Sequence, residues 1–450
     1  MRLLEHCRPF VRFLGGLWVL AIVATASAHA ATQDVLSRDL ESPSRAEPQS
    51  LALRTPQADR LAALVDEAMR HSPIVVAAGR RWEAMTRVPI QVATLPDPQV
   101  TLQEFTVGGP APAEGYETSD FYYTGFGVSQ DIPWPGKLRS QRVESEHEAE
   151  FARQNYEAAR RQVARKVRES YFELFFIRKA LGIIDNTRDE LEQIEQIAET
   201  RYRVGQALEQ DVIRAQLEMT SILKETEERR QDAAQRQVEL KAILGRSVDS
   251  ADIEVGEVEP TELKRDSPRL AALVGARSPE LKMARAMEAK SEEALKLAHQ
   301  NYVPDFSVGY MYQKTGPGLR DYYMLTLGAK IPLYFWRKQT PAVEQAAFDR
   351  DAARNETRAR ELEIRAEAQS RLIAIETALR VMTLYREGMI PQAEATRAAA
   401  LSAYRVGKAD FQTLISAVIE VLQLNQGYYR ALADHEIAVA RIQQIIGDMP

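Results

Sequence analysis

Hydrophobic positions along the chain follow two periods, one typical of helices and one typical of strands. Residues 137–204 contain no proline and a single glycine, and they are rich in alanine, glutamate, arginine and glutamine, which favour helix. They predict one very long helix, on the order of 100 Å at about 1.5 Å per residue. Residues 341–406 match them in the second half of the chain. Because a glycine ends each long helix, we expect partner helices at about 207–245 and 409–447 to return beside them.

Segments with a period of two separate these helices. In one of them, Tyr323, Leu325 and Leu327 fall on one side and Met324, Thr326 and Gly328 on the other, an alternation typical of a strand. The alternation predicts four strands, at about 99–107, 120–132, 304–313 and 321–331. Each has about 9 to 13 residues, close to the length of a tilted transmembrane strand.

The same unit occurs twice. Residues 201–205 (RYRVG) return at residues 403–407 (AYRVG), 202 positions later. Two upstream pairs are 130–133 (QDIP) with 329–332 (AKIP), and 95–97 (LPD) with 303–305 (VPD), at offsets of 199 and 208. We predict a tandem duplication with halves at 58–247 and 260–447.

Four strands cannot close a barrel, and open sheet edges are not tolerated in lipid. After residue 30 no segment reaches roughly 18 consecutive apolar residues, the length of a membrane-spanning helix, so a membrane-spanning form must use strands. Closure then needs several copies. Two copies would give about eight strands and three about twelve, and barrels are built with either number.

The start of the chain indicates export. An uncharged stretch at residues 13–28 follows three arginines, and residues 28–30 (AHA) carry the small-x-small pattern of a cleavage site. These are the parts of a secretory signal peptide. We therefore predict that residues 1–30 are removed.

Composition narrows the function further. Removing residues 1–30 takes three arginines and one glutamate from 58 basic and 64 acidic residues, which leaves a formal charge of -8 and disfavours nucleic-acid binding. The only cysteine, Cys7, precedes the apolar core, so we predict no lipid anchor and no disulfide. Residues 31–57 are rich in serine, proline, aspartate and arginine and predict a flexible extension, to which we assign no function.

Catalytic motifs are absent from the sequence. The histidines after residue 30 are far apart, at His71, His147, His299 and His435. There is no H-x-x-x-H pair, P-loop, nucleophile elbow or dinucleotide-binding glycine motif. We predict that the protein is not an enzyme and has no cofactor and no metal site.

The leader, the duplicated strand-strand-helix unit and the two Tyr-Arg-Val-Gly segments together resemble the TolC family of outer-membrane efflux proteins, over about 58–447. Residues 127–138 (GVSQDIPWPGKL), with 96–98 (PDP) before them, are most similar to the branch associated with heavy-metal efflux. The resemblance implies a mainly α-helical homotrimer. Its twelve strands, four from each chain, would form one outer-membrane β-barrel, continued by a long periplasmic α-helical barrel.

The resemblance also implies a function. Such a protein is the passive exit duct of a tripartite efflux system, supplied by a periplasmic adaptor (membrane fusion) protein and an inner-membrane pump of the resistance-nodulation-division type. Heavy-metal cations would be the solute. Ducts for multidrug efflux or type I secretion share the fold and stay open as alternatives, and a soluble periplasmic coiled-coil scaffold or adaptor is an alternative of another class.

Family members contact the adaptor through their helix tips. Here these contacts would be Arg203, Val204, Gly205, Arg405, Val406 and Gly407. The plainer interpretation of the two glycines is a left-handed helix cap, which is compatible with docking.

Family members also close their gate with polar links between the tips. Asp211 and Tyr404 match the linking aspartate and its tyrosine partner. The family's basic partner falls at Ala409, and Lys408 would substitute in a direction about 100° away.

An aspartate ring known in some members falls at Thr413 and Ser416, so that constriction is expected to be absent. Asp410 would supply negative charge to the gate instead. The alternative for Asp211 and Asp410 is that each is a solvated aspartate at a helix end.

Overall fold

The computed structural model describes residues 56–105, 122–261, 267–316 and 318–447. All of them lie in one compact unit, Arg54–Pro450. The predicted signal peptide (1–30) and nearly all of the predicted extension (31–57) lie outside the described residues.

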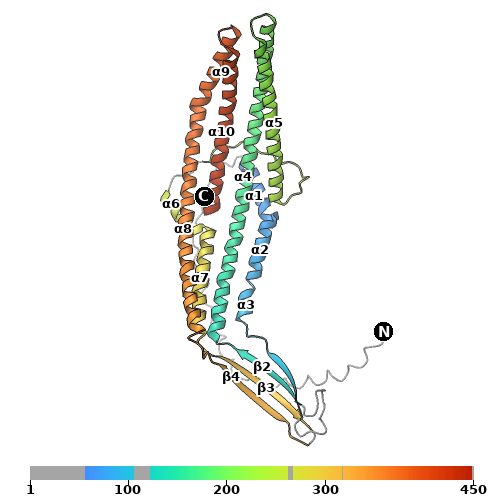
Figure 1. Cartoon of the computed structure of the whole chain (residues 1–450), viewed down its shortest axis with the longest axis vertical. Coiled ribbons are helices and arrows are strands. Elements are labelled where there is room, and N and C mark those ends of the chain that lie inside the picture. Colours follow the sequence, from blue (N-terminus) through green and yellow to red (C-terminus); the bar gives the residue numbers. More distant parts are fainter. Residues whose placement is uncertain (1–55, 106–121, 262–266, 317, 448–450) are drawn as a thin grey trace, which may run out of the picture. The chain divides into compact units, whose positions relative to one another are not determined.

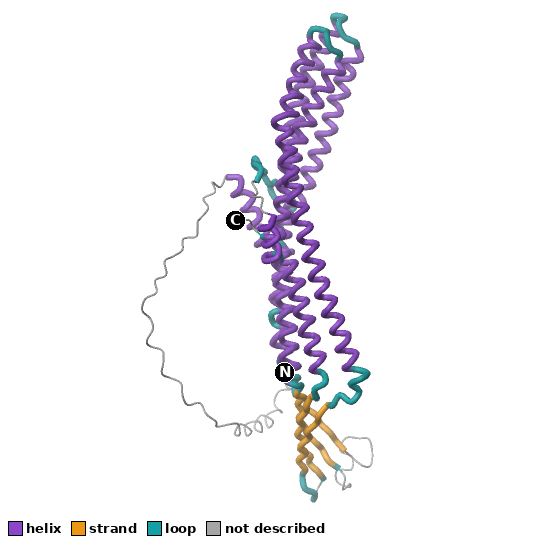
Figure 2. The backbone as a smooth tube through the Cα atoms, turned by 90° about the vertical axis from the view of Figure 1, so that its left-hand side faces the viewer, coloured by secondary structure: helices purple, strands orange, loops and turns teal. Residues whose placement is uncertain are grey.

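Helices make up most of the described chain, and the strands form one small sheet (Figures 1 and 2). In chain order the elements are α1 (Pro56–His71), α2 (Pro73–Met85), α3 (Val88–Ala93), β1 (Gln99–Phe105), β2 (Tyr123–Ile132), α4 (Pro135–Arg203), α5 (Glu209–Leu244), α6 (Ser267–Arg277), α7 (Pro279–Gln300), β3 (Asp305–Thr315), β4 (Tyr322–Lys330), α8 (Gln339–Leu384), α9 (Ile390–Arg405) and α10 (Phe411–Ile446). The predicted fold class of the chain is confirmed, whereas its trimeric assembly stays a prediction.

Helix α4 is the longest element, with 69 residues, or roughly 100 Å. It begins directly after β2 with Pro135, whose fixed φ suits a first helical position. It packs against α5, α7 and α10, so it contacts helices of both repeats. None of the described helices is long and apolar enough to cross a membrane.

The second long helix is interrupted. A π-helical turn at Tyr385–Met389 separates α8 from α9. Pro391 has no N–H group to donate to the carbonyl four residues earlier, and a wider turn before it absorbs this loss. The segment predicted as one helix at 341–406 is therefore two α-helices joined by this turn.

Helices α1, α2, α3, α6 and α7 fall where the sequence analysis assigned no element. Helices α1 to α3 lie along α4, and α7 packs between α4 and α8 (Figure 1). The α7 sequence has its own start signal, because the Ser278 hydroxyl accepts the Leu281 N–H at 3.4 Å and Pro279 follows it. Each repeat thus has helices before its strands as well as after them.

The strands, orange in Figure 2, are antiparallel and lie in the order β1-β2-β3-β4. Representative register pairs are Gln99 with Ser129, Ile132 with Phe306, and Ser307 with Gly328. Strands β1 and β4 are the outer strands, and each has one edge without a partner strand in the described sheet.

The two faces of this sheet differ in polarity. Large apolar side chains, each at least 37% exposed, occupy one face: Val100, Leu102, Phe126, Val128, Phe306, Val308, Tyr310, Tyr323, Leu325 and Leu327. The other face is mostly polar or small and includes Gln99, Thr101, Gln103, Ser129, Asp131, Ser307, Gln313, Thr326 and Lys330. An apolar surface this continuous is typical of a face that contacts lipid or protein.

A buried lysine joins the two repeats where the sheet meets the helices. Lys137, in the first turn of α4 and only 8% exposed, donates to the Asp305 carboxylate at 2.8 Å and to the Val303 carbonyl at 2.9 Å. The Trp134 backbone N–H donates to the same carboxylate at 3.0 Å. The helix that follows β2 is thereby bound to the residue that opens β3.

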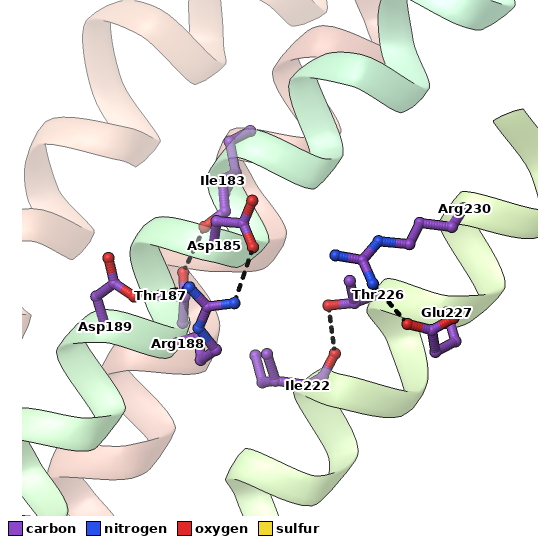
Figure 3. A network of polar contacts seen from close by, with 9 residues as sticks. All are labelled: Ile183, Asp185, Thr187, Arg188, Asp189, Ile222, Thr226, Glu227 and Arg230. Atoms are coloured by element: carbon purple, nitrogen blue, oxygen red, sulfur yellow. Dashed lines mark hydrogen bonds and ion pairs between the residues drawn. The ribbon is translucent and has the colours of Figure 1, made fainter.

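Around Thr187 and Thr226, the polar groups of α4 and α5 are satisfied inside their own helices. The buried hydroxyls of Thr187 and Thr226 donate to the carbonyls of Ile183 and Ile222, both at 2.9 Å (Figure 3). The charged side chains drawn beside them pair with neighbours in their own helix. The contact between these helices in this region is therefore made by apolar side chains, among them Ile184.

Contacts between the repeats combine shared apolar clusters with ion pairs. Arginines of α9 and α10 reach acidic residues of α4, in the pairs Arg397–Glu190 at 2.6 Å, Arg430–Glu173 at 2.9 Å and Arg441–Glu169 at 2.9 Å. Part-exposed pairs contribute little stability one by one. They do fix which faces of the helices meet.

Two helix-ending glycines give a matched test of the packing. Gly245 (φ 74°) ends α5, and a Cβ there would lie 2.8 Å from the His71 carbonyl oxygen, whereas Gly205 (φ 73°) has open space. We expect Gly205→Ala to cost about 1–2 kcal/mol, because alanine disfavours the left-handed region. Gly245→Ala should cost more, because the backbone of α1 must also move. Thermal unfolding followed by circular dichroism measures both, and equal losses would contradict a tight contact at His71.

Candidate functional site

The two hairpin tips have the same backbone geometry. Gly205 and Gly407 both have φ of 73°. At the first tip the N–H groups of Gly205 and Gln206 donate to carbonyls of the last helical turn at 2.9 and 2.8 Å, and the second tip repeats these bonds at 3.0 and 2.8 Å. This is the Schellman cap. The glycines therefore act as helix caps, and their role in docking stays a prediction.

Apolar and basic side chains at these tips face solvent. Val204 and Val406 are 63% and 68% exposed. Arg203 is exposed and pairs only within its own helix, with Glu199 at 2.5 Å, and Arg405 is exposed as well. At each tip, an exposed valine directly follows an exposed arginine, and the two side chains provide a small surface that another protein could bind.

Arg201 connects the tips of the two repeats. Its guanidinium carbon lies 4.6 Å from the centre of the Tyr404 ring, a cation–π arrangement. The same guanidinium donates to the backbone carbonyl of Tyr404 and, at 3.1 Å, to that of Gln206. Tyr404 is only 2% exposed, and Phe411 packs against the edge of its ring.

This connection was not predicted. The sequence does contain a signal for it, because position 403 of the second repeat holds alanine where the first repeat has Arg201. An arginine at this position in the first repeat alone indicates a contact that the second repeat does not make in return. Its partner, 203 residues away, could not be named without the fold.

Asp211 and Tyr404, predicted to be linked in the gate, lie near each other without a hydrogen bond. Among the described residues, the buried Tyr404 hydroxyl has no partner. Burial raises the pKa of Tyr404, the Asp211 carboxylate raises it further, and Arg201 partly opposes them. Asp211 itself lies in the first turn of α5, where the helix dipole favours a carboxylate. The two groups thus interact through space in the single chain.

Asp410 caps α10. Its carboxylate accepts the Thr413 backbone N–H at 3.0 Å and also the Thr413 hydroxyl. These bonds lower the pKa of Asp410. The cap is therefore fully present above the ordinary carboxyl pKa and is lost as pH falls through the lowered value. This favours the helix-end interpretation of Asp410, although its charge still lies at the tip.

The other gate candidates are exposed. Lys408 follows the cap of the second tip, and Thr413 and Ser416 lie on the exposed side of α10. No group of three or more histidine, cysteine or acidic side chains in the described ranges could hold a metal ion.

Variants of two arginines in the last turn of α4 distinguish the effect of the contact between the tips from the effect of exposed charge. We expect Arg201→Ala to loosen the second tip by about 1–2 kcal/mol, since it removes a cation–π contact and two hydrogen bonds. Amide hydrogen exchange around Tyr404 would then be roughly five to thirty times faster. Arg203→Ala is the control, because Arg203 pairs only with Glu199. Equal exchange in both variants would show that Arg201 does not hold the tips together.

The sequence also matches known proteins. A sequence model of one family, described as outer membrane efflux protein, matches residues 98–246 and 270–448. A search of curated proteins gives no significant match.

Solved structures share the fold at low sequence identity. The outer-membrane channel OprN is 16% identical with a TM-score of 0.75, over 86% of this chain and 90% of its own. The outer membrane protein VceC of Vibrio cholerae is 18% identical with a TM-score of 0.75, over 86% and 96%. CusC, described as forming a transmembrane channel, is 14% identical with a TM-score of 0.76, over 92% and 100%.

The family match covers both repeats, including the strands and the two capped tips, and it confirms the resemblance seen in the sequence. The chain belongs to the outer membrane efflux protein family.

Proposed function

We propose that this protein is the outer-membrane exit duct of a tripartite efflux system. Three copies would combine their sheets into one twelve-stranded barrel, and their long helices would continue it as a periplasmic tunnel. Solutes would pass through without chemical change. The observation that carries the proposal is the four-stranded sheet, which has an exposed apolar face, a polar face and two open edges.

The sheet has the properties that a barrel wall needs. Its strands contain 7, 10, 11 and 9 residues, near the roughly 9–11 that cross a bilayer when tilted. The apolar face would meet lipid, and the polar face would line a water-filled lumen. The described residues form no membrane-spanning helix that would offer another route.

The tips would be the docking and gating end. Exposed Val204 and Val406, with the arginines and glycines beside them, would bind a periplasmic adaptor, which in turn joins a pump of the resistance-nodulation-division type. Asp211 and Tyr404 would link the closed tips, and Lys408 and Asp410 would add charge at the mouth. The apolar α4–α5 contact near Ile184 favours this gate, because apolar contacts are non-directional and tolerate a shift between the two helices.

Heavy-metal cations are the solute that we propose. The support is the junction between β2 and α4 (residues 127–138), which resembles the heavy-metal branch.

Variants of three arginines at the tips distinguish the effects on docking from the effects on gating. We expect the double variant Arg203→Ala, Arg405→Ala to bind the adaptor about tenfold more weakly, because exposed arginines are common anchors at interfaces. Arg201→Ala should leave adaptor binding nearly unchanged and make cells more permeable to large antibiotics. Adaptor co-purification and growth tests measure the two effects. Loss of adaptor binding in Arg201→Ala alone would contradict this division.

Deletion of the gene tests the solute. We expect the deletion to lower the tolerated concentration of a heavy-metal salt several-fold and the intact gene to restore it. Unchanged metal tolerance with increased drug sensitivity would contradict the metal assignment and favour multidrug export. Recovery of the mature protein in the soluble periplasmic fraction, without a heat-sensitive oligomer, would contradict the exit duct itself.

A further inference from the structure

The outer edges of β1 and β4 present backbone N–H and C=O groups that pair with no other described strand. Every residue of β1, and all but one of β4, is exposed. Such edges are costly in lipid, where water cannot satisfy them. The internal repeat allows the partner of each edge to be inferred residue by residue.

The repeat is numerically consistent within the sheet. Moving β1 by its offset of 208 and β2 by its offset of 199 places them on β3 and β4. The pair Gln99–Ser129 then becomes Ser307–Gly328, and Phe105–Tyr123 becomes Gln313–Tyr322. Both translated pairs occur in the observed register. The two hairpins of the sheet are therefore equivalent strand for strand.

The remaining contact, β2 with β3, joins the second strand of the first repeat to the first strand of the second repeat. Adding 199 to each β2 residue number and subtracting 208 from each β3 residue number converts the β2–β3 pairs into pairs of β4 with β1. One chain cannot make this pairing. We propose that β4 of one copy pairs antiparallel with β1 of a neighbouring copy in this register, from Ile331–Pro98 through Leu327–Leu102 and Thr326–Gln103 to Met324–Phe105. The inference rests on the proposed function, since it requires several copies to close one barrel.

Side-chain chemistry agrees with this register. Leu327 meets Leu102 on the apolar face, and Thr326 meets Gln103 on the polar face. A slip of one residue would place apolar side chains opposite polar ones along the whole contact.

The strand tilt agrees as well. Val100 aligns with Val128, then Tyr310, then Leu325, and in the proposed register with Glu104 of the next copy. Four strands thus displace the register by four residues, or about 13 Å along the strand over about 19 Å across the sheet. The corresponding tilt is about 35°, within the range of transmembrane barrels. A slip of two residues would give about 20° or about 45°, and either would break the equivalence of the repeats.

An ion pair is also expected at this contact. Within the chain, Lys137 after β2 binds Asp305 at the start of β3. Asp97 is the counterpart of Asp305, whereas the offset of 199 places Trp336 at the position of Lys137, with the basic residues Arg337 and Lys338 directly after it. Asp97, Arg337 and Lys338 are exposed, and none has an ion pair in the described part of the chain. We expect Asp97 of one copy to meet this basic pair of its neighbour.

Disulfide cross-linking in the full-length protein tests the register. Cys7, the only cysteine, lies in the segment predicted to be removed, so introduced cysteines report alone. The matching pairs are Leu327→Cys with Leu102→Cys, and Thr326→Cys with Gln103→Cys. Two consecutive pairs are used because hydrogen-bonded and non-hydrogen-bonded pairs alternate along the strands, and the side chains of the non-hydrogen-bonded pairs lie closer together. We expect at least one to give covalent dimers and trimers on denaturing gels.

Displaced pairs are the controls. The first control combines Thr326→Cys with Thr101→Cys instead of Gln103→Cys, and the second combines Leu327→Cys with Val100→Cys instead of Leu102→Cys. Each displaced partner is on the same face but diagonal, about 7–8 Å from the first cysteine, which is beyond easy disulfide formation. We expect at least fivefold less product from them. Equal or better cross-linking of the displaced pairs, in a heat-sensitive oligomer, would overturn the register and leave the exit duct intact. Absence of that oligomer in the cysteine-free parent would overturn both.

A charge exchange tests the ion pair. Asp97→Lys should reduce in-register cross-linking about two- to fivefold, as expected for loss of a surface pair. Adding Arg337→Glu and Lys338→Glu should restore it. No loss in the single variant, or no recovery in the triple variant, would overturn the ion pair.

Discussion

Backbone hydrogen bonding at the edges of the small sheet is the constraint on which the rest of the protein depends. Four strands leave β1 and β4 each with one open edge, and lipid offers no substitute partner. Only other strands can satisfy these edges inside a membrane. In the proposed barrel, two repeats of one design would meet this requirement, because repeats whose contacts are equivalent can be joined in a ring without a special closing contact.

Helix α4 connects the sheet to the tips. Lys137 binds it to the start of β3, and its last turn holds Arg201, which contacts the second repeat. Along its length, α4 packs apolar side chains against α5, α9 and α10, and it adds ion pairs toward α9 and α10. The two hairpins of a chain are therefore joined by both apolar and ionic contacts.

Much of the fold could be predicted from the sequence, since long periodic segments determine their own secondary structure. Helix α4 and the four strands lie close to their predicted positions because uninterrupted helix formers and strict alternation leave few other options. Helices α1, α2, α3 and α6 were missed because their periodic stretches are brief, with 6 to 16 residues. Helix α7 was missed although its 22 residues are long enough to show a helical period. The π-helical turn was missed because Pro391 lies within an alanine-rich segment that otherwise predicts helix.

The site was predictable in part. Gly205 and Gly407 could be identified as caps, and Asp410 precedes an apolar helix start, as a capping residue does. Arg201 could not be assigned a partner, because its contact with Tyr404 depends on how two distant hairpins pack.

The single arginine between the repeats has a consequence for symmetry. Arg201 has no counterpart in the second repeat, where Ala403 takes its position. In a trimer, six hairpins would surround the mouth, yet they would meet along two alternating kinds of seam. Three seams within chains would be pinned by arginine, and three between chains would lack that pin. Such a mouth would widen as three leaves, with its first openings between neighbouring chains.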